Sequence, residues 1–188
     1  MKGILFNVLE DVVSEEHGAD AWDDLLERTD VDGAYTAIGN YADAEFVRLL
    51  QALPGADETP ARVALRAFGR AAMHRMAAVY PAFFRPHVST PAFLMTVNDI
   101  IHPAVRCLYP GADVPVFDVT PDEATGELVI AYRSGRRLCH LAEGFVAGAA
   151  EHFGERAEVV QTSCMHTGAA ACVLRCAFTA PAGARERP

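Results

Sequence analysis

The stretch HPAVRCLYPGADVPVFDV, residues 102–119, contains the change from helical to strand-like sequence that decides the fold. Apolar residues repeat at helical spacing over 93–108, and the turn residues 109–111 end that helix. After the turn, residues 114–119 have the apolar and β-branched composition of a strand. The stretch therefore predicts a boundary between a helical half and a sheet half of the chain.

The residues upstream of this boundary are predicted to be helical. Apolar residues at spacings of three and four, separated by capping and breaking residues, define five helices. Their expected limits are Ile4 to Gly18, Asp20 to the loop at Asp32, Asp43 to Pro54 and Gly55, Thr59 and Pro60 to Tyr80, and Thr90 and Pro91 to Leu108. Small residues at Gly69, Ala71 and Ala72 in the fourth helix leave room for a bulky group.

The residues downstream of the boundary predict strands with one inserted helix. Strands are expected at 127–132, 158–164 and 172–178, and a helix at 137–152. We therefore expect one α+β domain over 1–180, with a mainly helical half at 1–110 and a mainly antiparallel sheet half at 111–180. The tail 181–188 has no large apolar residue and is expected to be disordered.

Charge and hydropathy exclude several classes of partner. The net charge is −9, whereas binding to nucleic acid or to an anionic membrane relies on clustered basic residues, so neither partner is expected. No apolar run approaches the roughly 18 to 20 residues of a membrane-spanning helix. No signal-peptide cleavage site follows the first residues. These features predict a cytoplasmic protein.

His102 is the first candidate for chemistry. It lies at the edge of the apolar face of its helix, on the same side as Met95 and Asn98. From this place the imidazole can project into an apolar cleft, which suits a ligand to haem iron. A hydrogen-bonded structural histidine is the alternative, and His102 alone does not decide between them.

The second candidate is the segment YRSGR, residues 132–136. If this segment stays extended, Tyr132, Ser134 and Arg136 project to one side, and together they can bind a carboxylate or a phosphate. The alternative is that Ser134 caps the following helix and the arginines are solvated.

These motifs together resemble one family. The histidine in HPAVRCLYPGADVPVF, the later pattern YRSGR and the opening MKGILFNVLEDVV are similar to the haem-nitric oxide/oxygen-binding (H-NOX) family, from Met1 to about Phe178. The resemblance implies haem b between the two halves, with His102 as the only protein ligand to iron. It also implies that Tyr132, Ser134 and Arg136 hold the propionates. Pro115 would press on the haem from the proximal side and distort it.

The resemblance also suggests which gas is bound. Leu141 stands where oxygen-binding members carry a distal tyrosine, and Leu9 and Ala72 correspond to supporting polar positions. With Leu5 they would form a distal pocket without a hydrogen-bond donor, which bound dioxygen needs more than nitric oxide or carbon monoxide does. We therefore expect a nitric oxide sensor that also binds carbon monoxide and excludes oxygen. If the alignment is shifted by one residue, the pocket would contain Tyr80 or His140 instead.

The family mechanism implies a separate partner protein. Nitric oxide would weaken or break the bond between iron and His102, and the released strain would shift the helical half against the sheet half. For stand-alone bacterial members, the partner that detects this shift is a histidine kinase or a cyclic-di-GMP enzyme.

Five cysteines in the second half of the chain suggest another site. An odd number without a dense framework favours reduced thiols or metal ligands over disulfides. Cys139, Cys164 and Cys172 are expected to converge at one end of the sheet, and with one nitrogen ligand they would form a tetrahedral zinc site. Buried free thiols are the alternative.

The sequence offers more than one nitrogen ligand for such a zinc site. Family members with a zinc site carry a histidine at the position of Gln161 in this chain. His166 or His140 would therefore have to replace it.

Further sequence features bear on two other functions. The chain has no HExxH motif, no GxSxG motif and no Gly-rich phosphate loop, so an enzyme is not expected. A zinc- or thiol-based redox-sensing interaction module is the alternative to the haem sensor.

Overall fold

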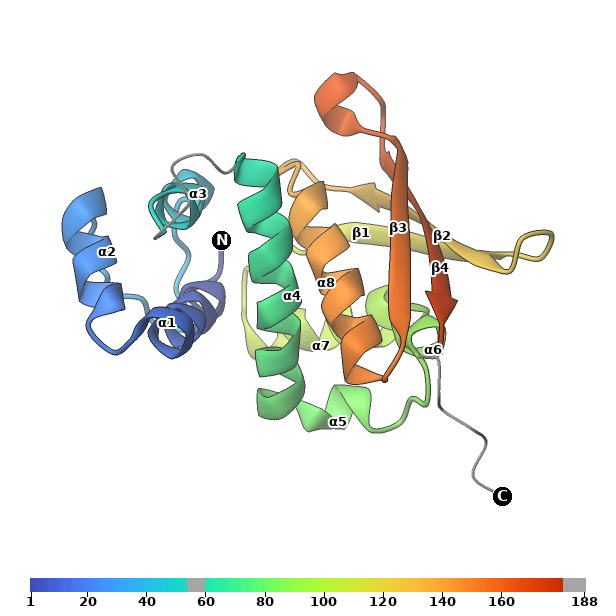
Figure 1. Ribbon diagram of the computed structural model, residues 1–188, viewed down its shortest axis with the longest axis horizontal. Helices are drawn as coiled ribbons and strands as arrows, with labels where there is room; N and C mark the ends of the chain where they lie inside the picture. Colours follow the sequence, from blue (N-terminus) through green and yellow to red (C-terminus); the bar gives the residue numbers. More distant parts are fainter. Residues whose placement is uncertain (54–59, 181–188) are drawn as a thin grey trace.

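The computed structural model describes residues 1–53 and 60–180 (Figure 1). The helices are α1 (Gly3–His17), α2 (Ala21–Thr29), α3 (Asp43–Gln51), α4 (Ala61–Val79), α5 (Pro81–Phe84), α6 (Thr90–Leu94), the π-helical turn η1 (Val97–Ile101), α7 (His102–Leu108), α8 (Cys139–His152) and the 3-10 turn η2 (Met165–Thr167). The strands are β1 (Val116–Asp122), β2 (Glu127–Arg133), β3 (Arg156–Ser163) and β4 (Cys172–Thr179). The predicted α+β class is confirmed.

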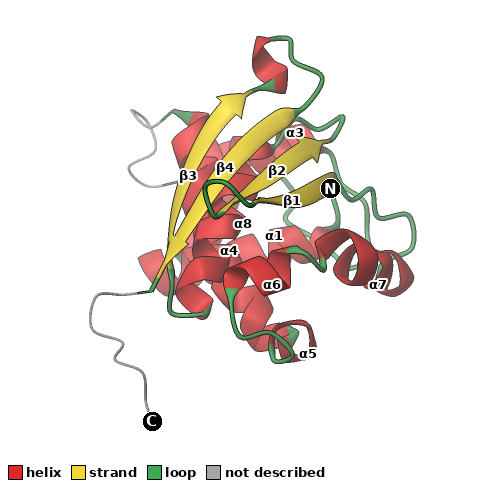
Figure 2. Cartoon of the chain, turned by 90° about the vertical axis from the view of Figure 1, so that its right-hand side faces the viewer, coloured by secondary structure: helices red, strands yellow, loops and turns green. Residues whose placement is uncertain are grey.

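The four strands form one antiparallel sheet in the order β1-β2-β4-β3. Alternate residues of β2 and β4 are buried, as expected for a sheet with one face against a core. In Figure 2 the helices gather on that one face of the sheet. The sheet is therefore one wall of any space between the two halves.

Helices α4 and α8 run side by side through the middle of the molecule (Figure 1). Glycines at their contact allow the two backbones to approach closely. A Cβ atom on Gly69 would lie 2.5 Å from the carbonyl oxygen of Leu141, and one on Gly144 would lie 2.2 Å from that of Arg66. The small residues of α4 thus make room for α8, which corrects the expectation that they make room for a bulky group.

Hydrophobic side chains form two large clusters. The first lies within the helical half, and Phe6, Phe46 and Phe68 are buried in it. The second joins α4, α6 and α8 to the sheet and includes Ile130 and Leu174. Residues of α8 take part in both clusters, so this helix connects the helical core to the sheet.

The helix expected over 93–108 is broken into α6, η1 and α7. Pro103 has no N–H to donate to the carbonyl of Asp99, so a regular α-helix cannot continue through this point. The backbone responds with a π-helical turn, in which the N–H of Ile101 donates to the carbonyl of Thr96 (3.1 Å). His102 follows this turn directly.

Other expected limits are close to the observed ones. Strand β1 begins at Val116 rather than at residue 114, and β3 begins at Arg156 rather than at residue 158. The expected helix end at Pro54 and Gly55, the cap at Thr59 and the tail 181–188 lie outside the described residues. None of the described helices is long and apolar enough to cross a membrane.

Candidate functional site

A cavity of about 250 Å³ lies between the helices and the sheet. Its wall is almost entirely apolar. The residues that line it are Lys2, Ile4 and Leu5; Met73, Met76, Tyr80, Phe83 and Phe84; Phe93, Leu94, Val97, Ile101, His102, Val105, Leu108 and Tyr109; Ala112, Asp113, Val114, Pro115, Phe117, Val119 and Ile130; and Arg136, Ala142, Phe145 and Val146. Both halves of the chain therefore contribute to one apolar site.

His102 is positioned at this cavity by the first turn of α7. Its Nδ1 is buried and has no hydrogen-bond partner among the described residues. Burial, followed by the positive charge of Arg106, lowers the pKa of His102 to about 4, although the Pro115 backbone acts in the opposite direction. The imidazole is therefore neutral near pH 7 and can act as a metal ligand.

Asn98 connects the segment that carries His102 to the sheet. Its side-chain amide donates to the carbonyl of Phe117 (2.5 Å), and its side-chain oxygen accepts from the N–H of Phe117 (3.1 Å). The Phe117 ring lies 5.7 Å from the His102 ring between centroids. These two hydrogen bonds fix the position of η1 along β1. They are made at Phe117, two residues after Pro115.

The segment YRSGR forms a turn rather than an extended clamp. Strand β2 ends at Arg133, and the N–H of Arg137 donates to the carbonyl of Ser134 (3.1 Å). The Ser134 hydroxyl accepts from the N–H of Arg136 (3.2 Å), and the buried Tyr132 hydroxyl accepts from the N–H of Leu138 (3.1 Å). Of the three expected clamp residues, only Arg136 lines the cavity.

Arg136 faces the cavity and also holds two acidic residues. Its Nη1 donates to the backbone carbonyl of Asp113 (2.8 Å), and its Nε lies 3.1 Å from a carboxylate oxygen of Asp43. A guanidinium at the edge of an apolar cavity can bind a carboxylate in a forked geometry. Together with the neutral His102, this donor set fits a haem, whose iron needs a ligand and whose propionates need a cation.

Of the residues predicted to form the distal pocket, one lies in the cavity wall and the others lie in the helical cluster behind it. Leu5 lines the cavity, whereas Leu9, Ala72 and Leu141 are buried in the helical cluster and do not line it. Leu5 and Phe145 pack against that cluster and also face the cavity. Ala72 and Leu141 thus lie behind the wall, because close packing of α4 on α8 fixes the rotation of both helices, and Leu9 of α1 is buried in the same helical cluster.

Lys2, Tyr109 and Asp113 are polar residues of the cavity wall that the sequence does not single out. The Lys2 amine donates to the carbonyls of Ile38 (2.9 Å) and Pro110 (2.6 Å). The hydroxyls of Tyr80 and Tyr109 are hydrogen-bonded to each other across the ends of α4 and α7. Burial, followed by this bond, raises the pKa of Tyr109 to about 12. In the sequence Tyr109 is visible only as a helix-ending residue, so its role depends on the fold.

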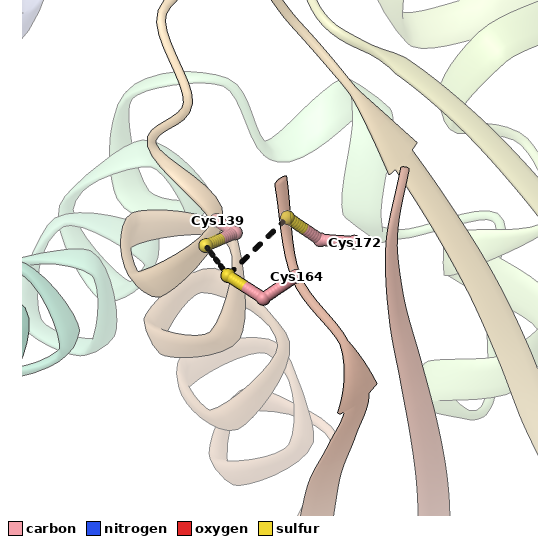
Figure 3. A group of neighbouring side chains, drawn as sticks. All are labelled: Cys139, Cys164 and Cys172. Carbon is pink, nitrogen blue, oxygen red and sulfur yellow. Dashed lines mark hydrogen bonds between the residues drawn. The ribbon is translucent and has the colours of Figure 1, made fainter. Parts of the chain in front are cut away.

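Three cysteines converge at the end of the sheet, as expected (Figure 3). The sulfur of Cys164 lies 4.0 Å from that of Cys139 and 4.0 Å from that of Cys172. Burial raises the pKa of both the Cys139 and the Cys172 thiol. The buried side-chain nitrogen of Gln161 has no hydrogen-bond partner within the described ranges 1–53 and 60–180. The three thiols fit a thiophilic metal. At position 161, however, this chain has the amide side chain of glutamine where a histidine ligand was described for family members with a zinc site.

Two histidines lie beside the same cysteine group. Cys139, His140 and His166 form a second set whose ligand atoms are all within 4.8 Å of one another. The His140 Nδ1 lies 3.2 Å from the buried carboxylate of Glu143. The structure thus places His166 with Cys139 and His140. It also places His140 outside the cavity, which removes His140 as a distal residue.

Comparisons with known proteins agree with this architecture. A family model described as haem-NO-binding matches residues 2–161. The fold is similar to the crystal structure of an H-NOX protein from S. oneidensis in the Fe(II)NO state, with 31% identity and a TM-score of 0.87, covering 95% of this chain and 99% of that chain.

Two further structures are similar to the chain. The NMR structure of the H-NOX domain from Shewanella oneidensis in the Fe(II)CO state has 32% identity and a TM-score of 0.85, covering 95% of this chain and 99% of that chain. The crystal structure of the unliganded Fe(II) H-NOX protein from K. algicida has 26% identity and a TM-score of 0.80, covering 95% and 97%. No curated protein matches the chain. The family match and these similarities show that the chain belongs to the haem-NO-binding (H-NOX) family.

Proposed function

We propose that this chain is a haem-based gas sensor that selects nitric oxide and carbon monoxide over oxygen. The observation that carries the proposal is the neutral His102, whose half-buried imidazole lines an apolar cavity. Solved relatives bind nitric oxide or carbon monoxide on Fe(II). H-NOX domains are sensor domains rather than catalytic ones, so no enzymatic role is proposed.

His102 and Arg136 would hold haem b in this cavity. Bound haem supplies the iron to which the gas binds. His102 is the protein ligand to that iron, Arg136 pairs with a propionate, and Pro115 limits the space on the side of β1. The hydroxyls of Tyr132 and Ser134 shape the turn that presents Arg136.

Selectivity would follow from the part of the cavity wall that α1, α4 and α8 form. The side chains that α1, α4 and α8 contribute there are apolar, from Leu5 to Met73 and Phe145. Bound dioxygen carries partial negative charge and gains more from a hydrogen-bond donor than nitric oxide does. Reduced protein in air is therefore expected to show no stable oxy spectrum. A stable oxy spectrum would contradict the selectivity and would direct attention to the Tyr80 hydroxyl.

The signal would pass through the segment that carries His102. A change at His102 would be passed on through α7, because Asn98 of the adjoining turn η1 connects to β1 and the Tyr80–Tyr109 pair connects the end of α7 to the end of α4. A shift of these contacts changes the surface that a separate protein can recognise. We propose a histidine kinase or a cyclic-di-GMP enzyme as that partner.

A His102→Gly variant tests the assignment. We expect it to bind haem only when imidazole is added, because imidazole can replace the missing side chain. His17→Gly, at the exposed end of α1, is the control and should load haem normally. Normal loading of His102→Gly without imidazole, measured by the Soret band, would rule out His102 as the ligand.

A second candidate function is a zinc- or thiol-based redox module at Cys139, Cys164 and Cys172. The mutual approach of their sulfur atoms favours it (Figure 3). Zinc content should then fall in Cys172→Ser and remain in Cys176→Ser, since Cys176 is buried on the same strand outside this group. Equal zinc content in both variants would count against a thiol site.

A further inference from the structure

Lys2 is the only lysine among the 16 lysine and arginine residues of the chain, and it is buried at the cavity. The residue is 6% exposed. Its amine donates to the carbonyls of Ile38 (2.9 Å) and Pro110 (2.6 Å). Because an ammonium group has three N–H donors, these two bonds leave one N–H for a further acceptor.

The positive charge of Lys2 is not balanced by an acidic side chain. Within residues 1–53 and 60–180, which the structure describes, no carboxylate forms an ion pair with Lys2. Asp43 and Asp113 lie near Arg136 instead, with carboxylate oxygens 3.1 Å and 3.9 Å from its Nε. A buried charge is costly unless an opposite charge pairs with it. Lys2 is therefore suited to an anion that binds in the cavity.

Backbone contacts hold Lys2 in place. It directly precedes α1 and forms an isolated β-bridge with Asn40. The N–H of the next residue, Gly3, donates to the carbonyl of Gly39 (3.1 Å). A Cβ atom on Gly3 would overlap the carbonyl oxygen of Thr36, so glycine permits this close approach. The Lys2 amine is thus positioned by the fold before any anion binds.

Lys2 and Arg136 are attached to the same short loop, residues 110–113. The Lys2 amine donates to the carbonyl of Pro110, and the Arg136 guanidinium donates to the carbonyl of Asp113 (2.8 Å). Three residues of chain span at most roughly 11 Å, so both cations lie in one region of the cavity wall. Haem carries two propionates on one edge of its ring. Two neighbouring cations therefore match its two carboxylates.

We propose that Lys2 binds one propionate of the haem and Arg136 binds the other. This inference rests on the proposed haem function and adds a residue to it. The third N–H of Lys2 donates to the carboxylate in a charge-assisted hydrogen bond, while the other two keep the carbonyls of Ile38 and Pro110. Pro110 closely follows α7, so one amine connects a propionate to the end of the helix that carries His102.

Haem dimethyl ester, in which both propionates are esterified, separates carboxylate binding from a structural role of Lys2. Lys2→Met keeps an apolar stem of similar length but has no charge and no N–H. It is expected to lose ordinary haem to apomyoglobin about 10-fold faster than the parent protein, or more. It is expected to lose the dimethyl ester at the parent rate, because an ester has no charged acceptor.

Arg85→Met is the matched control, since Arg85 is an exposed basic residue that does not line the cavity. It should lose both haems at the parent rate. Circular dichroism of each variant without haem shows whether it is folded.

The single lysine also allows a test on the parent protein, which does not depend on the folding of a variant. Lysine labelled with ¹³C at the ε carbon gives one NMR signal from the whole chain. In the Fe(II)CO complex this signal is expected to differ between ordinary haem and haem dimethyl ester. The same chemical shift in both complexes would contradict a bond between Lys2 and a propionate.

Two outcomes of the haem-loss experiment would overturn the proposal. Faster loss of both haems from Lys2→Met would show that Lys2 acts only through the carbonyls that it holds. Parent rates for both haems would show that Lys2 does not bind the cofactor. Either result leaves the haem function standing, because the parent protein still binds haem. Failure of the parent protein to bind either haem would contradict the proposed function itself, and this inference with it.

Discussion

Arg136 reaches three environments from one short turn. Its guanidinium lies at the cavity, donates to the Asp113 backbone and pairs with Asp43 at the start of α3. Asp43 belongs to the helical half and Arg136 to the sheet half, so the Arg136 side chain connects the two halves. A propionate that binds Arg136 would compete with Asp43 for the same donors.

Arg136→Lys is predicted to weaken haem retention although it keeps the charge. Lysine lacks the planar guanidinium group, which can donate hydrogen bonds to a propionate and to the Asp113 carbonyl at the same time. Loss of one charge-assisted hydrogen bond, worth about 1.5–3 kcal/mol, corresponds to haem loss about 10-fold faster or more. Transfer of haem to an excess of apomyoglobin measures this rate. Arg133→Lys, which points away to Asp118, should retain haem normally.

His102, Pro115, Arg136 and Leu5, which the sequence singles out by local context, all line the cavity, and their roles there stay predictions. The sequence does not show which residues face the cavity where the rotation of a helix decides. Leu141 and its neighbour Ala142 differ by one position, and only the contact of α8 with α4 determines that Ala142 faces the cavity.

At the scale of elements, the segment that carries His102 is shorter and less regular than its sequence suggests. The π-helical turn η1 leaves α7 as a two-turn helix that is anchored at one end by Asn98 and at the other by Tyr109. Short helices have little stability of their own, so these anchors determine where the helix lies.

Asn98→Ala is predicted to loosen this helix. The change leaves both backbone groups of Phe117 without their side-chain partner and should cost about 1–3 kcal/mol of unfolding free energy. Urea unfolding measures the loss, and a changed Fe(II) haem spectrum would report the altered position of His102. Asp99→Ala, an exposed neighbour, is the control and should change neither property.

Element limits were predictable where breaking residues stand at both ends. The end of α4 at Tyr80 and the starts of α6 and β4 follow directly from the sequence. The break at Pro103 was missed because apolar periodicity continues through it. The YRSGR turn is not visible in the sequence because its hydrogen bonds, which Ser134 accepts from the N–H groups of Arg136 and Arg137, form only where the strand ends.

For the whole molecule, the contact between α4 and α8 holds the helical half to the sheet half. It combines glycine contacts with ion pairs, since Glu151 of α8 binds both Arg70 and His74 of α4. Glu143 of α8 likewise pairs with Arg66 of α4, so charged pairs lie toward both ends of the contact and glycines lie between them.

Gly144→Ala is predicted to be strongly destabilising. Its Cβ would lie 2.2 Å from the Arg66 carbonyl oxygen, and backbone cannot rotate away as a side chain does. Overpacking of this kind costs about 1–3 kcal/mol or more. Thermal unfolding measures the cost. Gly135→Ala, with open space around its Cβ position, should leave the melting temperature nearly unchanged. Equal effects would show that α8 can shift without cost.

Glu151→Gln is predicted to change the dependence of stability on pH. The Arg70 guanidinium, and then His74, lower the pKa of Glu151 below its usual 4.5, with burial acting in the opposite direction. The ionised carboxylate therefore adds stability above pH 4.5 that is lost as the pH falls through the folded-state pKa. The variant should be less stable at pH 7 and show a flatter decline below pH 4.5. Glu158→Gln, exposed on β3, is the control.

Helix α8 supplies Leu141 and Val146 to the two large hydrophobic clusters, and Cys139 to a smaller one that also contains Tyr132 and Cys172. An insertion or deletion of one residue within α8 would rotate every later side chain by about 100° and move each out of its cluster. Length changes during evolution, or in engineered fusions, should therefore be tolerated in the exposed β1–β2 turn at 123–126 and rejected in α8.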